Sequence, residues 1–182
     1  MKVLIILGSR NPDGQTARAA EAFARGVKAG SGECEMICLP PLDIQRCRQC
    51  DANGWGICRT EGKCVIEDDF AAIADKIRGA DAVVFATPVY FGDLSESLQA
   101  LLNRLRRTCT HGDGKVGIAG KPAVGICVAG GGGGGAPRCC FILDWVLQSS
   151  GLAAEDMFPV RRQNLEAKLL LLEAAGKRFA SL

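Results

Sequence analysis

Uninterrupted apolar runs mark the strands of this chain. Residues 3–7, 82–86 and 123–128 are apolar almost throughout, which is the pattern of strands buried on both faces. Residues 34–39 partly alternate between apolar and polar positions and then reach two prolines, so another strand is predicted there. A weaker strand is predicted at 153–160.

Helical spacing fills the intervals between these runs. Leu98, Leu101, Leu102 and Leu105 recur at three- and four-residue intervals and predict an amphipathic helix. Comparable patterns predict helices at 17–29, 70–79, 137–149 and from 164 onward. The alternation of strands and helices indicates a parallel sheet between two helical layers, with no domain boundary. The helix at 137–149 is apolar on more than one side, which a subunit interface would explain.

The composition excludes several classes of function. The chain has 182 residues, of which 48% are hydrophobic and 23% charged, and its formal net charge is +2. That charge is too small to indicate binding to nucleic acid or to an anionic membrane. No apolar run reaches the length of a membrane span, and the first one is too short for a secretory signal, so we expect a cytoplasmic protein. Ten cysteines without an export signal favour metal or redox chemistry over disulfides.

The first strand is followed by a turn rich in glycine and hydroxyl groups, at 8–16, and then by a helix. This layout directs free backbone N–H groups and the positive end of a helix dipole at one point, which favours a bound phosphate. The turn lacks both the Gly-Lys-Ser/Thr of a P-loop and the Gly-x-Gly-x-x-Gly of a dinucleotide-binding fold. It therefore predicts a phosphate monoester or mononucleotide site, with donors at Ser9, Arg10, Gln15 and Thr16.

Two later loops suit a flat heteroaromatic ring. The loop after the third strand offers a rigid proline and apolar or aromatic surface, from Pro88, Val89, Tyr90, Phe91 and Gly92. The glycine tract at 130–135, beginning with Gly130 and Gly131, lets backbone N–H groups approach a ring edge. Ligands of parallel sheets bind beyond the carboxyl ends of the strands, so the three loops are expected to meet. A phosphate at one loop and a flat ring at the others describe FMN.

A long connection at about 43–67 carries Cys47, Cys50, Cys58 and Cys64, with glycines between them. Loops of this length inside a compact domain are usually functional. Four thiolates on a flexible loop are enough for a [4Fe–4S] cluster or for tetrahedral zinc. Reduced structural thiols, or thiols prone to disulfide formation, are the alternative, and the pattern does not decide between them.

The phosphate turn and the Pro-Val-Tyr-Phe-Gly stretch resemble the NAD(P)H-dependent FMN reductases of the flavodoxin-like superfamily, particularly the iron–sulfur flavoproteins. The matching pieces are Gly8-Ser9 with Gly14-Gln15-Thr16, the stretch 87–92 leading into Leu98 and Asn103-Arg104, and the glycine turn after the fourth strand. The resemblance spans nearly the whole chain. It implies a flavodoxin-like three-layer sandwich whose five-stranded parallel sheet has the order 2-1-3-4-5. It also implies one FMN-binding domain over 1–182 and a homo-oligomer, either a dimer or a tetramer.

By this resemblance, Ser9, Arg10, Gln15 and Thr16 hold the phosphate, and residues 88–92 line the isoalloxazine. The family commonly has Gly-Ser-Pro-Arg followed by Gly-Asn-Thr, whereas here Arg10 directly follows Ser9 and Gln15 replaces Asn. Thr16 is therefore a better candidate than Arg10. The iron–sulfur members have a compact cysteine motif, but here seven residues separate the second and third cysteines of the loop.

The leading hypothesis is an FMN-dependent oxidoreductase that takes a hydride from NAD(P)H and passes electrons to a small-molecule or protein acceptor. The cofactor carries the chemistry in such an enzyme, so no catalytic side chain is nominated. The alternative is a non-enzymatic electron carrier that holds FMN and an iron–sulfur cluster. A flavin-free receiver domain is disfavoured because the chain lacks the acidic cluster that such domains need after the first and third strands.

Other polar residues are assigned no chemistry. Arg104, Arg106 and Arg107 fall in the last turn of a helix, where they are expected to form a solvated face that complements the helix dipole. His111, the only histidine, is expected to be an inert loop residue.

Overall fold

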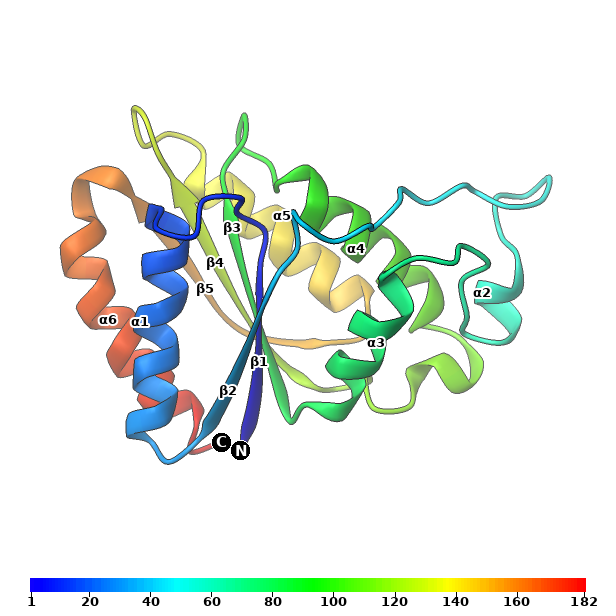
Figure 1. The fold of residues 1–182 in the computed structure, drawn as a ribbon, viewed down its shortest axis with the longest axis horizontal. Helices are drawn as coiled ribbons and strands as arrows, with labels where there is room; N and C mark the ends of the chain where they lie inside the picture. Colours follow the sequence, from blue (N-terminus) through cyan, green and yellow to red (C-terminus); the bar gives the residue numbers. More distant parts are fainter.

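In the computed structural model, which describes residues 1–182, a five-stranded parallel sheet lies between two layers of helices (Figure 1). The strands run in the order β2-β1-β3-β4-β5, and every neighbouring pair is parallel. Their bounds are Lys2–Leu7 for β1, Glu33–Cys38 for β2, Ala82–Pro88 for β3, Pro122–Ala129 for β4 and Ala153–Arg161 for β5. The predicted parallel sheet and its strand order are confirmed.

Helices cover both faces of this sheet. On one face lie α1 (Gln15–Ala29) and α6 (Leu165–Phe179). On the other lie α3 (Phe70–Gly79), α4 (Glu96–Thr108) and α5 (Ala136–Ser149). The short elements are α2 (Ile57–Thr60) and the 3-10 helices η1 (Gly112–Lys115) and η2 (Arg162–Asn164). None of the helices combines the length and the apolar character that crossing a membrane requires.

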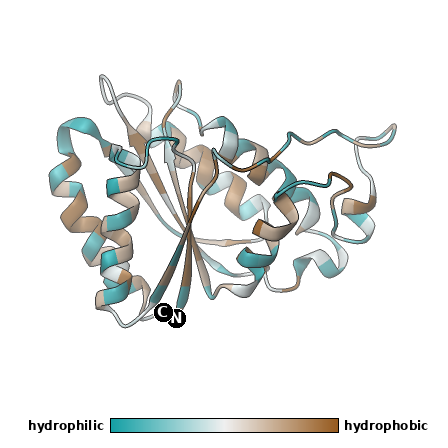
Figure 2. Cartoon of the chain, in the orientation of Figure 1, coloured by the Kyte–Doolittle hydropathy of each residue, from teal (hydrophilic) through white to brown (hydrophobic).

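Strand β1 illustrates why the apolar runs are continuous. Its successive side chains point to opposite faces of the sheet. Val3, Ile5 and Leu7 are buried in the core beneath α1 and α6, whereas Leu4 and Ile6 are buried in the core beneath α3, α4 and α5. Both faces are covered, so every position from 3 to 7 is apolar. The brown colour of the strands in Figure 2 reflects this two-sided burial.

Helices α1 and α6 pack closely because each has a glycine at their contact. A Cβ atom on Gly26 would lie 2.0 Å from the carbonyl oxygen of Glu173, and one on Gly176 would lie 2.2 Å from that of Phe23. Either alanine would therefore force the helices apart. This contact anchors α1, whose first turn forms part of the site described below.

The segment between β2 and α3 has little regular structure apart from α2. It projects beside α4, away from the α1/α6 layer (Figure 1). This is the stretch predicted as a cysteine-containing insertion at 43–67, and it is called the cysteine loop below.

Helix α5 has two apolar faces, as its sequence predicts. Cys139, Leu143 and Leu147 are buried against the sheet. Phe141 and Trp145, one turn apart on the outer face, are 69% and 67% exposed. The excess of apolar residues therefore faces outward rather than into the core.

Candidate functional site

A wide cavity of about 840 Å³ opens at the carboxyl ends of β1, β3 and β4. Its volume lies in the range of roughly 300–1,000 Å³ that is usual for ligand pockets. The walls come from the turn after β1, the loop after β3 and the glycine tract after β4. Most of the residues predicted to bind FMN line it: Ser9, Gln15, Thr16, Pro88, Val89, Tyr90, Phe91, Gly130 and Gly131.

The N-terminus of α1 forms one end of this cavity and has no cap. Its N-cap residue, Gly14, offers no side chain, and no acidic residue lies in the first turn. The first backbone bond into the helix is donated by the N–H of Arg18 to the carbonyl of Gly14. The preceding N–H groups of the helix therefore have no acceptor within the chain, and with the helix dipole they favour an anion.

Two of the three polar side chains at this end, Gln15 and Thr16, are available for a ligand. The Ser9 hydroxyl is engaged locally, through long bonds with the backbone of Asn11 at 3.3 and 3.4 Å. Thr16 is buried, and its hydroxyl forms no hydrogen bond within the chain. The Oε1 atom of Gln15 is buried without a partner. An unsatisfied buried polar atom costs about 1–3 kcal/mol, so this acceptor fits a hydrogen-bond donor of a ligand in the cavity, such as a hydroxyl group.

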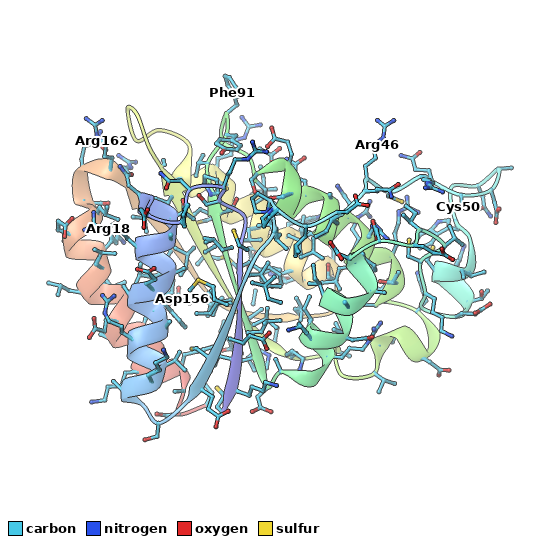
Figure 3. The ribbon with its side chains drawn as sticks, in the orientation of Figure 1. Arg18, Arg46, Cys50, Phe91, Asp156 and Arg162 are labelled. Atoms are coloured by element: carbon cyan, nitrogen blue, oxygen red, sulfur yellow. The ribbon has the colours of Figure 1, made fainter.

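The loop after β3 forms the opposite wall as a tight turn. Tyr90 and Asp93 exchange two backbone hydrogen bonds, of 3.0 and 2.9 Å. Phe91 lies at the tip with a positive φ of 52°, and its side chain is fully exposed. Figure 3 shows Phe91 directed away from the body of the molecule.

Two predicted residues do not line the cavity. Arg10 is exposed and does not line the cavity, whereas Thr16 does. Gly92 instead joins two walls of the cavity, because a Cβ atom on Gly135 would lie only 2.8 Å from the Cα atom of Gly92. Both glycines have a φ of +83°, a backbone conformation that residues with a side chain rarely adopt.

Sequence reasoning missed several residues that line the cavity, including Asn11, Asp13 and Arg18. Asn11 shapes the turn through a bond of 3.0 Å from the Asp13 N–H to its side-chain oxygen. Arg18 forms an exposed ion pair of 2.7 Å with Glu166 of α6. Arg18 follows Thr16 by only two residues, and the positive charge near a phosphate turn is the signal that could have identified it.

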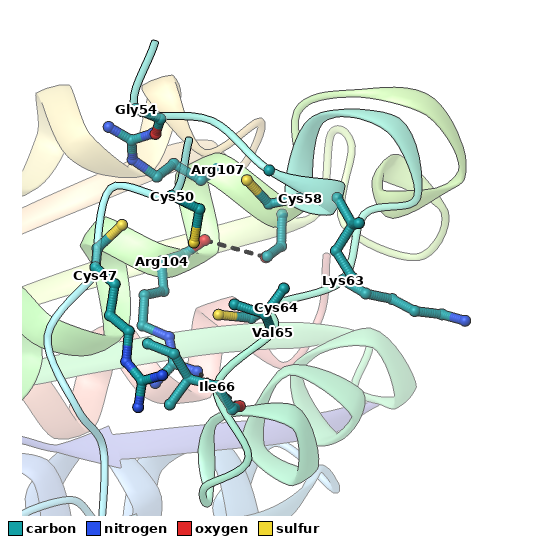
Figure 4. Close-up of a pocket in the computed structure, with 14 residues that line it drawn as sticks. Cys47, Cys50, Gly54, Cys58, Lys63, Cys64, Val65, Ile66, Arg104 and Arg107 are labelled. Carbon is teal, nitrogen blue, oxygen red and sulfur yellow. Dashed lines mark hydrogen bonds between the residues drawn. The ribbon is translucent and has the colours of Figure 1, made fainter. Parts of the chain in front are cut away.

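The four cysteines of the predicted metal site line one pocket on the other side of α4, called the thiol pocket below. Cys47, Cys50, Cys58 and Cys64 all face it (Figure 4), and its volume is about 20 Å³. The four are partly exposed, and every cysteine of the chain is a free thiol. No group of three or more His, Cys, Asp or Glu side chains is arranged to hold a metal ion. The loop thus gathers the thiols without bringing them into a metal-binding geometry.

Positive side chains surround these thiols. Arg48, Lys63, Arg104 and Arg107 line the thiol pocket, and no carboxylate does. Nearby cations stabilise thiolates and anionic groups. Four sulfur donors in a cationic pocket fit the chemistry of an anionic iron–sulfur cluster.

Arg107 also packs the stretch that separates the second and third cysteines. Its guanidinium lies 4.7 Å from the ring centre of Trp55 and donates a hydrogen bond of 2.6 Å to the carbonyl of Gly54. His111 packs edge-on against the same ring, with the ring centres 5.3 Å apart. The histidine therefore contacts Trp55 rather than lying free in its loop.

The prediction that Arg104 belongs to a solvated face is wrong. Arg104 is 1% exposed, and its partner Asp68 has a fully buried side chain. The two form a bidentate ion pair, with distances of 2.5 and 2.9 Å. The helical positions contain the missed signal, since Arg104 lies between Leu101 and Thr108 at intervals of three and four, and both neighbours are buried.

The pair changes the pKa of both partners. Burial alone would raise the pKa of Asp68, but hydrogen bonds from Arg104 and from the N–H groups of Gln45 and Phe70 outweigh burial and hold the pKa below its usual value. Burial alone would lower the pKa of Arg104, but Asp68 and the nearby Cys64 thiol reverse this and raise it. Both groups are therefore charged at neutral pH.

Comparison of the sequence with known proteins identifies a family and several relatives. Residues 1–140 match the family described as NADPH-dependent FMN reductase. An iron–sulfur flavoprotein of Methanocaldococcus jannaschii is 35% identical over 106 residues, which cover 58% of this chain and 52% of that protein. The chain spans about half the length of the curated relatives it matches.

Solved structures share the fold at low sequence identity. An NAD(P)H:quinone oxidoreductase from Methanothermobacter marburgensis has a TM-score of 0.69 at 17% identity, covering 98% of this chain and 96% of that one. The structure of RosB with a bound riboflavin-phosphate intermediate has a TM-score of 0.72 at 20% identity, covering 100% and 79% of the two chains. Together with the family match over most of its length, these findings show that the chain belongs to the NADPH-dependent FMN reductase family.

Proposed function

We propose that this protein is an FMN-dependent oxidoreductase that takes electrons from NAD(P)H and passes them to a small-molecule or protein acceptor. The observation that carries the proposal is the cavity at the sheet edge. It combines an uncapped helix N-terminus and an unpartnered Gln15 amide at one end with an apolar turn at the other. Family membership supports FMN as the ligand and NADPH as the electron donor.

The residues divide into two groups by what they offer a flavin mononucleotide. The free N–H groups of α1, with the hydroxyls of Ser9 and Thr16 and the NH2 group of Gln15, would hold its phosphate, and the Gln15 Oε1 atom would accept from a ribityl hydroxyl. Pro88, Val89 and Tyr90 would pack against its ring, and the glycine tract would place backbone N–H groups at the ring edge. Bound FMN supplies the redox chemistry, accepting a hydride and releasing electrons. The chain's own task is then to bind and orient the reacting rings.

The thiol pocket would hold a [4Fe–4S] cluster through Cys47, Cys50, Cys58 and Cys64. Two observations support this assignment: the four thiols line one cationic pocket, and the relatives that the chain matches are named iron–sulfur flavoproteins. The cluster would relay electrons between the flavin and a protein partner. Phe141 and Trp145 on the outer face of α5 are the candidate contacts for a homodimer or homotetramer.

Anaerobic purification followed by reconstitution with FMN tests the proposal. We expect oxidation of NADPH or NADH in the presence of a quinone or ferricyanide acceptor, together with flavin absorption bands. If neither nicotinamide is oxidised with any acceptor, the enzymatic proposal fails.

The same preparation tests the alternative, a non-enzymatic electron carrier, which the thiol pocket favours. Bound FMN with stoichiometric iron and sulfide, but without nicotinamide turnover, would support the carrier. If protein prepared without oxygen contains no iron or sulfide, neither the oxidoreductase nor the electron carrier has an iron–sulfur cluster.

A further inference from the structure

Arg104 joins the two ends of the cysteine loop. One terminal nitrogen, Nη1, donates to the carbonyl of Gln45 at 3.1 Å, near the start of the loop. The other, Nη2, donates to the carbonyl of Ile66 at 3.4 Å, near its end. Asp68, just beyond the loop, accepts from both nitrogens and itself accepts an N–H bond of 2.8 Å from Gln45. One buried side chain on α4 therefore fixes the loop at both ends.

These contacts leave one donor of Arg104 unused. The Nε atom is buried and has no hydrogen-bond partner. Phe70 covers the guanidinium plane, with its ring centre 4.2 Å from Arg104 Cζ. The N–H groups of a buried guanidinium normally have hydrogen-bond acceptors, because burying a donor of a charged group without an acceptor costs free energy. The unused N–H is therefore a buried donor that is available to an acceptor in the adjoining pocket.

The thiol pocket lies next to this donor. Arg104 is among the residues that line it, and Figure 4 shows its side chain beside that of Cys64. The Nε atom forms no hydrogen bond, although the Cys64 thiol lies close enough to contribute to the raised pKa of Arg104. A thiolate accepts hydrogen bonds more strongly than a thiol does, and a metal or cluster binds cysteine as thiolate.

We propose that Arg104 is a positioning residue for the group bound in the thiol pocket: it fixes both ends of the cysteine loop and donates its Nε–H to the Cys64 sulfur when a cluster is bound. This inference rests on the proposed iron–sulfur site. Hydrogen bonds to cluster sulfurs and nearby positive charge stabilise the reduced, more negative state, and so raise the reduction potential.

Two substitutions in the same ion pair separate this role from a purely structural one. Arg104→Gln removes a positive charge and the Nε–H, so the cluster potential is expected to fall. Asp68→Asn removes a negative charge and leaves the Nε–H in place, so the potential is expected to rise. Loss of loop structure alone would move both variants in the same direction, with loss of iron in each.

The experiment is a spectroscopically monitored redox titration of the holoprotein, with iron and sulfide measured on each sample. Arg107→Gln is the matched control, because Arg107 lines the same pocket but is partly exposed and bonds to Gly54. Solvent screens its charge, so a smaller shift than in Arg104→Gln is expected. Should Arg104→Gln not fold, Arg104→Lys keeps the charge but lacks Nε–H, and a lowered potential is expected there too.

A metal-free measurement tests the positioning role separately. Limited proteolysis of the apoprotein should cut the cysteine loop of Arg104→Gln faster than that of wild type, whereas Arg106→Gln, which changes an exposed side chain of the same helix, should be cut at the wild-type rate. Equal potentials in wild type and Arg104→Gln at full iron content would overturn the inference while leaving the cluster intact. A wild-type protein that binds no iron would overturn the inference and the proposed cluster together.

Discussion

The cavity at the carboxyl ends of β1, β3 and β4, called the flavin cavity below because FMN is its proposed ligand, differs from the thiol pocket in how it is formed. The walls of the flavin cavity are short turns attached directly to the ends of β1, β3 and β4, so the sheet register determines where they lie. The thiol pocket belongs to a long segment with a single short helix, and its position depends on side-chain contacts with α4. Figure 3 shows Phe91 and Cys50 well apart, at the two regions.

The two regions also differ in how far their residues are arranged for a ligand before one binds. The flavin cavity is open, with a volume of about 840 Å³, and its polar end already presents unpartnered groups. The thiol pocket has a volume of only about 20 Å³, and its cysteines are not among any group of side chains arranged to hold a metal ion. A turn on a rigid strand is preorganised by the fold, whereas the cysteine loop is held by side-chain contacts such as those of Arg104 with Gln45 and Ile66. If the proposed cluster is correct, its binding would complete the arrangement of the thiols.

Replacement of a single cysteine should separate the two regions most completely. We expect Cys47→Ser to lose the iron–sulfur absorption and bound iron while keeping the flavin spectrum, because cluster assembly needs all four thiolates. Cys34→Ser is the control, since Cys34 lies on β2 and outside the thiol pocket. Iron retained at the wild-type level in Cys47→Ser would show that this cysteine is not a ligand.

Breaking the buried ion pair should have the next largest effect. Arg104→Ala leaves Asp68 buried without its partner and is expected to lower the free energy of unfolding by about 3–5 kcal/mol. Urea unfolding at pH 7 measures this, with Arg18→Ala as the control, because the exposed Arg18–Glu166 pair is worth about 0–1 kcal/mol. The FMN dissociation constant of folded Arg104→Ala should equal that of wild type. A large change in FMN affinity would contradict the independence of the two regions.

The contrast between the two regions also decides how far the sequence predicts each. Strand runs such as 3–7 and 82–86 carry strong local patterns, and parallel pairing then brings the loops that follow them to one edge. Ser9, Thr16 and Tyr90 could therefore be assigned to one cavity without coordinates. Gly92 could not be separated from its neighbours, because its contact with Gly135 depends on how two loops pack.

Prediction was weaker for the cysteine loop because its geometry depends on long-range contacts. The spacing of Cys47, Cys50, Cys58 and Cys64 identifies the ligand candidates but does not place them around one pocket. The sequence wrongly predicts that Arg104 is exposed, because a charged residue on the last turn of a helix usually faces solvent. Its partner Asp68 lies 36 residues away in the chain, so no local pattern indicates the pair. Only tertiary structure reveals such a pair.

At the flavin cavity, removal of one hydroxyl should have a moderate effect. Thr16→Val loses a hydrogen bond to the proposed phosphate and is expected to weaken FMN binding by roughly 1.5–3 kcal/mol, as for other bonds to charged groups. Titration of flavin fluorescence measures the dissociation constant. Thr110→Val is the control, because the Thr110 hydroxyl bonds to the backbone of Arg106, outside the cavity. Equal FMN affinity in Thr16→Val and wild type would show that the phosphate binds elsewhere.

Acid should destabilise the cysteine loop gradually. The change in stability between neighbouring pH values is expected to be the smallest of the effects predicted here. The pKa of Asp68 is lowered in the folded state, below the value of about 3.9 expected in the unfolded chain. Its contribution to stability is therefore complete above that unfolded value and is lost as pH falls through the folded pKa. Urea unfolding between pH 7 and pH 3 should show a shallower decline in Asp68→Asn, which has no carboxyl group to titrate there.

The control for this pH dependence is Glu35, whose pKa is lowered by a surface hydrogen bond from Lys76. Solvent screens that pair, so Glu35→Gln should leave the acid profile close to that of wild type. Hydrogen exchange locates the effect, since acid should first expose the amides of residues 45–66 while those of β1 stay protected. Equal loss of protection in both regions would mean that Asp68 stabilises the whole fold rather than the loop. In that case the division between a sheet-determined cavity and a side-chain-held pocket would not hold.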